Sequence, residues 1–230
     1  IRGSAESIEC YYKTGCIINR RLYVGNIWQK TADSPDTYKH YGDRLLKSIT
    51  NKFDVLPDTE FIDVAIRDSE EIIKLAAFAG RLMQFKENIL YLINVSGDSE
   101  YLEAKFVNMG VQHPNAVVTT EVGVFWANEN GLWWFNGEKA PQNLIENKLD
   151  ISEWSNFFTG NTMIVGYYKP ERKVIIMDAA GSDDVNDGND IFMYNILSKS
   201  WNKGYDNFGI DDSSDTDSYG DSTNLVNYTE

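Results

Sequence analysis

The two histidines of this 230-residue chain, His40 and His113, are the first candidates for general acid–base chemistry. A serine or cysteine triad would have to use one of them. The sequence has no Gly-x-Ser-x-Gly elbow, no His-Glu-x-x-His pair and no glycine-rich phosphate loop. His113 precedes Pro114, a pairing typical of a turn. We therefore predict that the chain is not an enzyme, and we assign it no catalytic and no cofactor-binding residue.

Residues 184–190 form an oxygen-rich segment that invites a calcium-binding interpretation. Ca²⁺ takes about six to eight oxygen ligands, often from a single loop. The spacing does not fit an EF-hand. With Gly188 in the sixth place, Val185 falls on a ligand position, and no Glu closes the loop. A polar hairpin loop between Met177 and Ile191 is the preferred interpretation, and no metal ligand is predicted.

Trp126, Trp133, Trp134 and Trp154 supply indole faces that could stack on sugar rings. Strand alternation places Trp133 and Trp134 on opposite faces, which favours core packing for at least one of them. Paired carboxylates could cleave glycosides, but 35 acidic residues give no basis for choosing a pair. A receptor- or glycan-binding protein is therefore the alternative function, and a glycoside hydrolase is less favoured. The residues that would bind a ligand are unknown.

The composition narrows the classes of function and of fold that remain. A net charge of −14 argues against specific binding of nucleic acid or of an anionic membrane, because phosphate contacts need a basic surface. Cys10 and Cys16 are too few for a disulfide framework, so free thiols in a reducing compartment are expected. The sequence has no apolar run of about 18 residues, so no transmembrane segment is predicted. Aromatic residues make up 13% of the chain, which favours strands.

The elements that must position these side chains repeat along the chain. Residues 88–94 (NILYLIN) and 130–136 (NGLWWFN) each read as a turn, an aromatic-rich strand and a second turn. Looser copies lie at 21–26 and 191–195. Tyr91 and Trp133 stand 42 residues apart, which is close to the repeat of a β-propeller, whose blades span about 40 to 50 residues.

We therefore predict an all-β fold, a β-propeller of about four antiparallel strands per blade, over residues 1–205. An irregular insertion is expected at about 29–60, and an acidic loop or tail at 206–230. Residues 70–78 suit either a short helix or the first strand of a blade, and the propeller context favours the strand. Residues 153–158 are predicted as one helical turn between blades. The sequence does not predict the number of blades or how the ring closes.

Several stretches follow one another in an order shared with a known group of proteins. They are NRRLYVGN (19–26), DRLLKS (43–48) with KFD (52–54) and Pro57, GRLMQFK (80–86) with LYLIN (90–94), GVQHPNAVV (110–118), GVFWAN (123–128) and GLWWFNG (131–137). This order resembles the propeller-containing virion proteins of tailed bacteriophages, especially those of the tail nozzle or tail tubular B type. The similarity covers about residues 10–205 and is one of pattern, with no catalytic motif in it.

The resemblance implies a non-enzymatic structural protein of the phage virion. Nozzle-type proteins form a ring, expected here as a hexamer, at the distal end of the tail or connector. DNA passes through the ring without specific binding, and other tail proteins dock on its outside. No cofactor and no membrane segment are expected. The chain is short for a whole nozzle protein, so we expect it to be part of a longer one.

Overall fold

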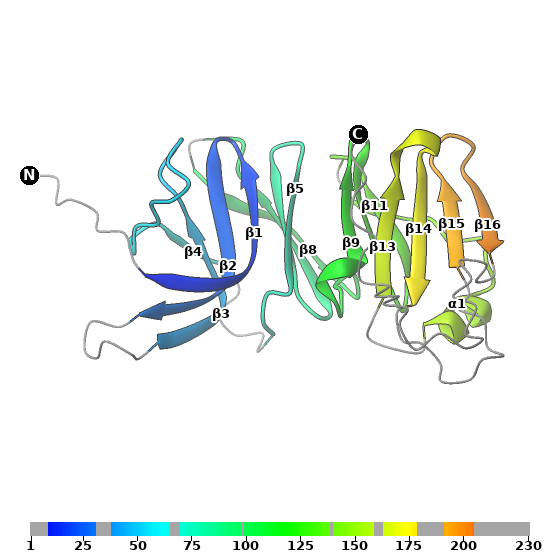
Figure 1. Cartoon of the computed structure of the whole chain (residues 1–230), viewed down its shortest axis with the longest axis horizontal. Coiled ribbons are helices and arrows are strands. Elements are labelled where there is room, and N and C mark those ends of the chain that lie inside the picture. Colours follow the sequence, from blue (N-terminus) through cyan, green and yellow to red (C-terminus); the bar gives the residue numbers. More distant parts are fainter. Residues whose placement is uncertain are drawn as a thin grey trace, which may run out of the picture.

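The computed structural model describes residues 9–30, 38–64, 70–97, 99–138, 140–158, 163–178 and 191–204. Its strands form four antiparallel sheets of four strands each, and in every sheet consecutive strands pair as a meander (Figure 1).

The first sheet contains β1 (Cys10–Ile18), β2 (Arg21–Lys30), β3 (Tyr38–Lys47) and β4 (Phe61–Asp63). The second contains β5 (Lys74–Phe78), β6 (Arg81–Phe85), β7 (Ile89–Asn94) and β8 (Tyr101–Val107). The third contains β9 (Val117–Thr120), β10 (Gly123–Asn128), β11 (Gly131–Phe135) and β12 (Gln142–Asn143). The fourth contains β13 (Met163–Tyr168), β14 (Lys173–Asp178), β15 (Ile191–Asn195) and β16 (Ser200–Gly204).

Little of the described chain is helical. The helical elements of the described residues are α1 (Ile151–Phe157) and two short 3₁₀ turns, η1 (Pro114–Ala116) and η2 (Lys169–Glu171). The predicted fold class is confirmed: the protein is all-β, with four-stranded antiparallel blades of the β-propeller type. The helical turn expected at 153–158 is present as α1. The ambiguous segment 70–78 contains a strand, β5, as the propeller context predicted.

The four blades follow one another in chain order. Their first strands contact each other, β1 with β5, β5 with β9, and β9 with β13. The first strand of each blade therefore lies on the inner side of the series, and the fourth strand forms the outer edge. The first and fourth blades lie at opposite ends of the molecule (Figure 1). Among the described residues, neither end blade has another blade packed on its outer face.

Layers of apolar side chains join the blades. Tyr23 of the first blade and Leu82 of the second meet in one buried cluster. A larger cluster extends from the second blade to the fourth and includes Phe85, Trp126 and Phe192. Phe85 and Trp126 pack edge to face across two blades, with ring centroids 5.2 Å apart. Large aromatic side chains therefore fill the space between sheets, which accounts for their abundance in the sequence.

Strands extend into the expected insertion at 29–60. β2 continues through Lys30, and β3 already begins at Tyr38. The last residues of β2 and the whole of β3 are therefore strand residues inside the segment that was expected to be irregular. Polarity misled the prediction here because this end of the hairpin is exposed on the surface. The segment after β3 is irregular, as expected, up to β4.

The hairpin turn between β10 and β11 is not the type I′ turn that the sequence pair Asn130-Gly131 suggests. A type I′ turn at Asn130-Gly131 requires positive φ at both residues. Only Gly131 has a positive φ, of 144°, and it already pairs with Asn128 in the strands. The turn is instead closed by the side chain of Asn128, whose Oδ1 accepts a hydrogen bond from the backbone N of Asn130 at 2.9 Å. This side-chain bond replaces the backbone conformation that the Asn-Gly pair suggested.

Candidate functional site

The structure places the two histidines in separate surroundings. Nδ1 of His113 accepts a hydrogen bond from the backbone N of Asn115 at 3.3 Å, so this side chain caps η1. That agrees with the turn predicted there. His40 lies in β3 with its Nε2 only 2.7 Å from Oδ1 of Asn26 in β2. His40 therefore belongs to a polar cluster that includes the buried side chain of Asn26.

Asn26 is the centre of this cluster. It lies at a β-bulge, where the pairing of β2 with β3 shifts between Gly25 and Ile27, and its φ is 56°. Its side chain is 1% exposed and donates through Nδ2 to the backbone oxygen of Ile72 at 2.9 Å and to Oε2 of Glu71 at 3.0 Å. Because Nδ2 is the donor, Oδ1 accepts, and Nε2 of His40 carries the hydrogen.

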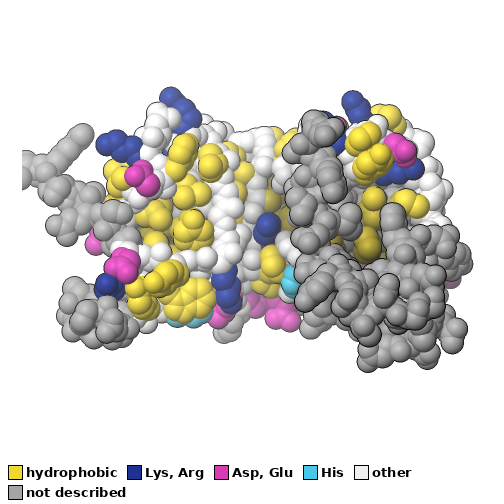
Figure 2. All heavy atoms as spheres, in the orientation of Figure 1, with side chains coloured by type: hydrophobic (Ala, Val, Ile, Leu, Met, Phe, Trp, Pro, Cys, Tyr) yellow, Lys and Arg dark blue, Asp and Glu magenta, His cyan; other side chains and the backbone are white. Residues whose placement is uncertain are grey.

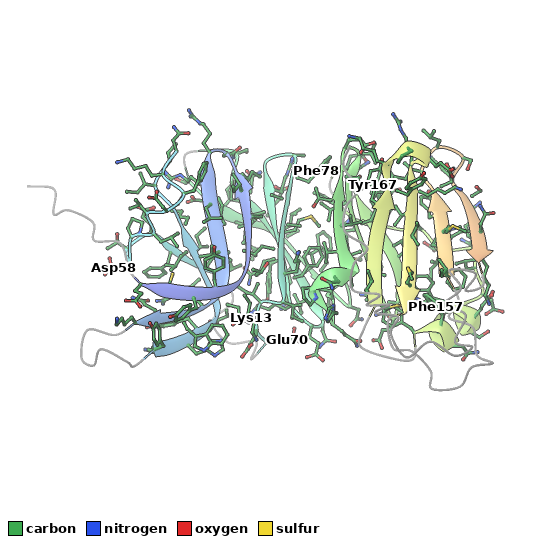
Figure 3. All side chains as sticks on the ribbon, in the orientation of Figure 1. Lys13, Asp58, Glu70, Phe78, Phe157 and Tyr167 are labelled. Carbon is green, nitrogen blue, oxygen red and sulfur yellow. The ribbon has the colours of Figure 1, made fainter. Side chains whose placement is uncertain are left out.

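Other side chains surround Glu71 and His40. The Lys13 ammonium lies 3.4 Å from Glu71, at the lower end of the joint between the first two blades (Figure 3). The rings of Trp28 and His40 stack at 4.2 Å. The hydrogen bond from Asn26 lowers the pKa of Glu71; burial opposes the shift, and Lys13 adds to it. We refer to Lys13, Asn26, Trp28, His40 and Glu71 as the Asn26 cluster.

The Asn26 cluster brings an imidazole and a carboxylate together, which is the pair that proton transfer would use. The amide of Asn26 stands between Nε2 of His40 and Oε2 of Glu71 and bonds to both. It also bonds to the backbone at Ile72, where the chain enters the second blade. The cluster is therefore a polar clamp between the first two blades, because its polar atoms form hydrogen bonds across the joint between them.

A second polar clamp crosses the same joint. Nζ of Lys47 in β3 donates to both carboxylate oxygens of Glu100, at 2.8 and 2.9 Å. Burial of Glu100 opposes its ionisation, but the bonds from Lys47 prevail and lower the pKa of the carboxyl group. The hydroxyl of Tyr23 also lies 3.4 Å from Glu100. Burial and the neighbouring Glu100 carboxylate raise the pKa of Tyr23 to about 12.

The tryptophans singled out as sugar platforms have structural roles. Trp126 and Trp154 are fully buried, and Trp133 and Trp134 are half-buried. Each indole N–H donates a hydrogen bond within the protein: Trp126 to Met109 O, Trp133 to Asn128 Oδ1, Trp134 to Val122 O and Trp154 to Asn128 O. Core packing, the favoured interpretation, holds for this set. Asn128 receives two of these bonds and is the main polar link of the third blade.

Two sequence-based candidates lie outside the described residues, namely the oxygen-rich segment 184–190 and the acidic segment 206–230. Within the described part of the chain, no group of three or more His, Cys, Asp or Glu side chains is arranged to hold a metal ion. No helix in that same part is long and apolar enough to cross a membrane. Cys10 and Cys16 are free thiols, and burial raises the pKa of Cys16 to about 12.

The outer face of the fourth blade is apolar. Val174 and Ile176 belong to the core shared with the third blade, so strand alternation turns Ile175 and Met177 to the opposite face. Ile164 pairs with Met177, and Met193 pairs with Ile175. A side chain added at Gly166, which pairs with Ile175, would meet no heavy atom within 4 Å. We define the outer face of the fourth blade by these positions. They are Ile164, Gly166, Ile175, Met177 and Met193.

The outer face of the first blade is also apolar. Val24 and Leu46 form a separate cluster with Leu56, on the side of the sheet away from the second blade. Ile17 and Phe61 lie beside it at 61% and 44% exposure. They share this face because Ile17 pairs with Leu22 of the cluster and Phe61 pairs with Leu46. Hydrophobic side chains gather over the first blade on the side seen in Figure 2. We define the outer face of the first blade by Ile17, Leu22, Val24, Leu46 and Phe61.

No sequence motif indicates either outer face, but the apolar pattern of the fourth blade carries a signal. Residues 163–165, 174–177 and 191–194 are runs of consecutive apolar residues, which are typical of strands covered on both faces. Taken with a four-stranded blade, such runs indicate that a last blade has a second packing face. The sequence pattern gives no such signal for the Asn26 cluster, because its residues lie far apart, with Lys13 and Glu71 separated by 58 positions.

Comparisons with known proteins assign the chain to no family. No protein-family model and no curated protein sequence matches the chain. Among solved structures, YCF48 bound to D1 peptide aligns with a TM-score of 0.37 at 11% identity, covering 86% of this chain and 74% of YCF48. The extracellular domain of BT4673 from B. thetaiotaomicron aligns with a TM-score of 0.34 at 13% identity, covering 71% of this chain and 31% of that one. At TM-scores below 0.5, neither likeness bears on function.

Proposed function

We propose that the chain is a non-enzymatic structural component of a tailed-phage virion, of the tail nozzle type. Its copies form a ring around the tail axis through which DNA passes. The observation that carries this proposal is the apolar face at each end of the blade series, defined by residues such as Ile17 and Met193. Apolar patches of this kind mark surfaces that associate with other proteins.

The places that the phage-like sequence stretches occupy in the fold support a structural role. The stretch 123–128 forms β10, and 131–137 begins with β11, so both belong to the third blade. All six residues of β10 are buried. Asn128 at its end bonds to the backbone of Asn108 and Gly110, which connects the second blade to the third. The residues that carry the phage resemblance therefore support the stiffness expected of a virion part.

The charge of the chain fits passage of DNA without binding. A net charge of −14 repels phosphates, and such repulsion keeps a channel wall from retaining a polyanion. In the proposed ring the chain would repel the DNA, and neighbouring tail proteins would dock on its outer side.

Electron cryo-microscopy of the native particle that contains this chain tests the proposal. We expect a ring of copies around the tail axis, with no ligand in the propeller funnel. A single propeller on the particle or cell surface, with its funnel open and occupied by a sugar, would refute the nozzle role. That result would favour glycan binding instead.

A further inference from the structure

Asparagine side chains close turns of this protein in a recurring way. In each of these turns, Oδ1 of the asparagine accepts a hydrogen bond from the backbone N–H two residues further along the chain, which makes an Asx turn. The bond holds the side-chain carbonyl group close to the backbone nitrogen of the residue in between. Turns of this kind lie at Asn94, Asn128, Asn136, Asn143 and Asn195.

This closeness allows a reaction between the two groups. The backbone nitrogen after the asparagine attacks the side-chain carbonyl carbon, a new C–N bond closes a succinimide ring, and the side-chain nitrogen leaves as ammonia. Water then opens the ring at either carbonyl, which gives aspartate or isoaspartate. The attack needs a following residue without a bulky side chain and a backbone N–H that can lose its proton. Asparagine is a thermolabile residue in proteins.

The Asx turn of Asn136 meets the first of these needs. Asn136 is followed by Gly137, which has no side chain to obstruct the attack. Among the Asx turns above, no other asparagine is followed by glycine. Their following residues are Val95, Glu129, Leu144 and Ile196.

The Asx turn of Asn136 also meets the second need. The backbone N–H of Gly137 donates no hydrogen bond within the part of the chain that the structure describes. The N–H groups that follow Asn94, Asn143 and Asn195 donate to backbone oxygens at 3.0, 2.8 and 2.9 Å, respectively. An N–H that is shared with an oxygen is held away from the side-chain carbonyl and keeps its proton, so these three turns are protected.

Asn130 is also followed by a glycine, but the fold restrains this pair. Gly131 is buried and pairs with Asn128 between β10 and β11. Nδ2 of Asn130 donates to the backbone oxygen of Asn108 at 3.3 Å. The backbone nitrogen of Gly131 therefore reaches the Asn130 side chain only after the hairpin opens.

We propose that Asn136 is a site of spontaneous modification, at which the folded protein converts this residue to isoaspartate and aspartate. Oδ1 of Asn136 accepts a hydrogen bond from the backbone N–H of Glu138 at 3.0 Å. This bond stabilises the negative charge that develops on the oxygen when the nitrogen of Gly137 attacks. Water is the other reactant, and the reaction does not depend on the proposed role in a virion.

The fold itself requires the glycine that makes Asn136 reactive. Gly137 has a φ of 91°, a conformation that favours glycine. A Cβ atom added at Gly137 would lie only 2.8 Å from Cβ of Ala79 and 3.7 Å from Cε1 of Phe78. Figure 3 shows Phe78 at the upper end of the second blade. The turn after β11 thus packs closely on the turn that joins β5 to β6.

This contact gives the modification a structural consequence. Isoaspartate lengthens the backbone by a methylene group and adds a carboxylate two residues before Glu138. The lengthened turn no longer fits against Ala79, because the space there does not admit even a Cβ atom at Gly137. Modification of Asn136 therefore weakens the joint between the second and third blades.

Incubation of the purified 230-residue chain at pH 8 for several weeks tests the site. Peptide mass spectrometry locates deamidation, and labelling by an isoaspartyl methyltransferase identifies isoaspartate. We expect Asn136 to react, and Asn130 to react at least about tenfold more slowly, because the Gly131 N–H is available only in the opened hairpin. In concentrated urea the two residues should react at similar rates. An unmodified Asn136, or equal rates at the two sites in the folded protein, would overturn the proposal.

A variant separates the effect of the fold from that of the sequence. Ile196→Gly gives Asn195 a glycine follower and retains its Asx bond from Leu197 at 2.9 Å, but the N–H at position 196 still donates to Arg172. We expect Asn195 in this variant to react on the order of tenfold more slowly than Asn136. Equal rates in the folded variant would show that the sequence alone sets the reactivity. Circular dichroism shows whether the variant is folded, and the wild-type comparison of Asn136 with Asn130 does not depend on it.

The weakening of the joint is measured on the modified protein. Ion exchange separates it by its added negative charge, and peptide mapping selects the fraction modified at Asn136. Urea denaturation of this fraction should show a lower midpoint than that of the unmodified protein. Asn136→Ser is the matched control, because its hydroxyl can accept the bond from Glu138 but cannot form a succinimide. Its midpoint should not change during the same incubation, and an unchanged midpoint of the modified fraction would refute the weakening.

Discussion

The side-chain amide of Asn26 donates a hydrogen bond to the backbone oxygen of Ile72, 2.9 Å away across the joint between the first two blades. Asn26 lies in the left-handed region of φ, at 56°, and its side chain is buried. Asn tolerates this conformation better than most residues, and its amide satisfies backbone and side-chain groups at once. One residue thus fixes both the bulge in β2 and the entry of the chain into the second blade.

Asn26→Ala should destabilise the protein by about 3 kcal/mol. The substitution leaves the Ile72 oxygen without its donor, and alanine is strained at a positive φ. Urea denaturation followed by fluorescence measures the loss. Asn51→Ala is the matched control, because Asn51 has a similar φ of 61° but an exposed side chain. It should cost about 1 kcal/mol. Equal losses for the two variants would show that the Asn26 amide contributes nothing beyond backbone strain.

The bond between Lys47 and Glu100 should make stability depend on pH in the acid range. The pKa of Glu100 is lower in the folded protein than its ordinary value, so its contribution is complete above that ordinary value. The contribution is lost as the pH falls through the lowered pKa. Glu100→Gln should therefore be less stable than the wild type at pH 7, by about 1 kcal/mol, and the difference should vanish in acid. Urea midpoints measured between pH 7 and 3 test this, and a difference that stays constant over that range would contradict it.

Trp154→Ala should cost about 3–5 kcal/mol, because it empties a large buried volume. Trp154 is fully buried in α1, and its indole N–H donates to the backbone oxygen of Asn128 at 3.0 Å. Phe157 of the same helix lies below the fourth blade (Figure 3), and its ring packs against Phe192 at 4.7 Å. Thermal unfolding compares the variant with Leu197→Ala, an exposed control expected to change stability by less than about 0.5 kcal/mol. A Trp154→Ala variant as stable as this control would show that the helix does not anchor the blade.

Cys16 should resist alkylation in the folded protein. Burial raises the pKa of its thiol to about 12, and the thiolate is the reactive form. Iodoacetamide at pH 8 should label Cys16 far more slowly in buffer than in urea, as followed by peptide mass spectrometry. The pKa of Cys10 is also raised by burial, so this residue should be protected as well. Rapid labelling of Cys16 without denaturant would show that the joint between the first two blades opens readily.

The sequence by itself determined the blade architecture. The 42-residue repeat and the alternation of turns with aromatic strands are local features, and local hydrogen bonding and side-chain burial make them a meander of four strands. Strand pairing between neighbours in sequence needs no long-range information. The same alternation favoured core packing for at least one of Trp133 and Trp134, and both pack, half-buried, against the core.

Only the tertiary structure decided the contacts between blades. Lys13 and Glu71, or Lys47 and Glu100, meet because two sheets stack, and their separation in sequence carries no trace of that contact. The same holds for the outer faces. Apolar residues on both sides of β14 were visible in the sequence, but which side is already covered depends on where the third blade packs. Stacking of sheets is a non-local event without a sequence period, which is why the sequence predicted the blades and the structure was needed to show which of their faces pack together.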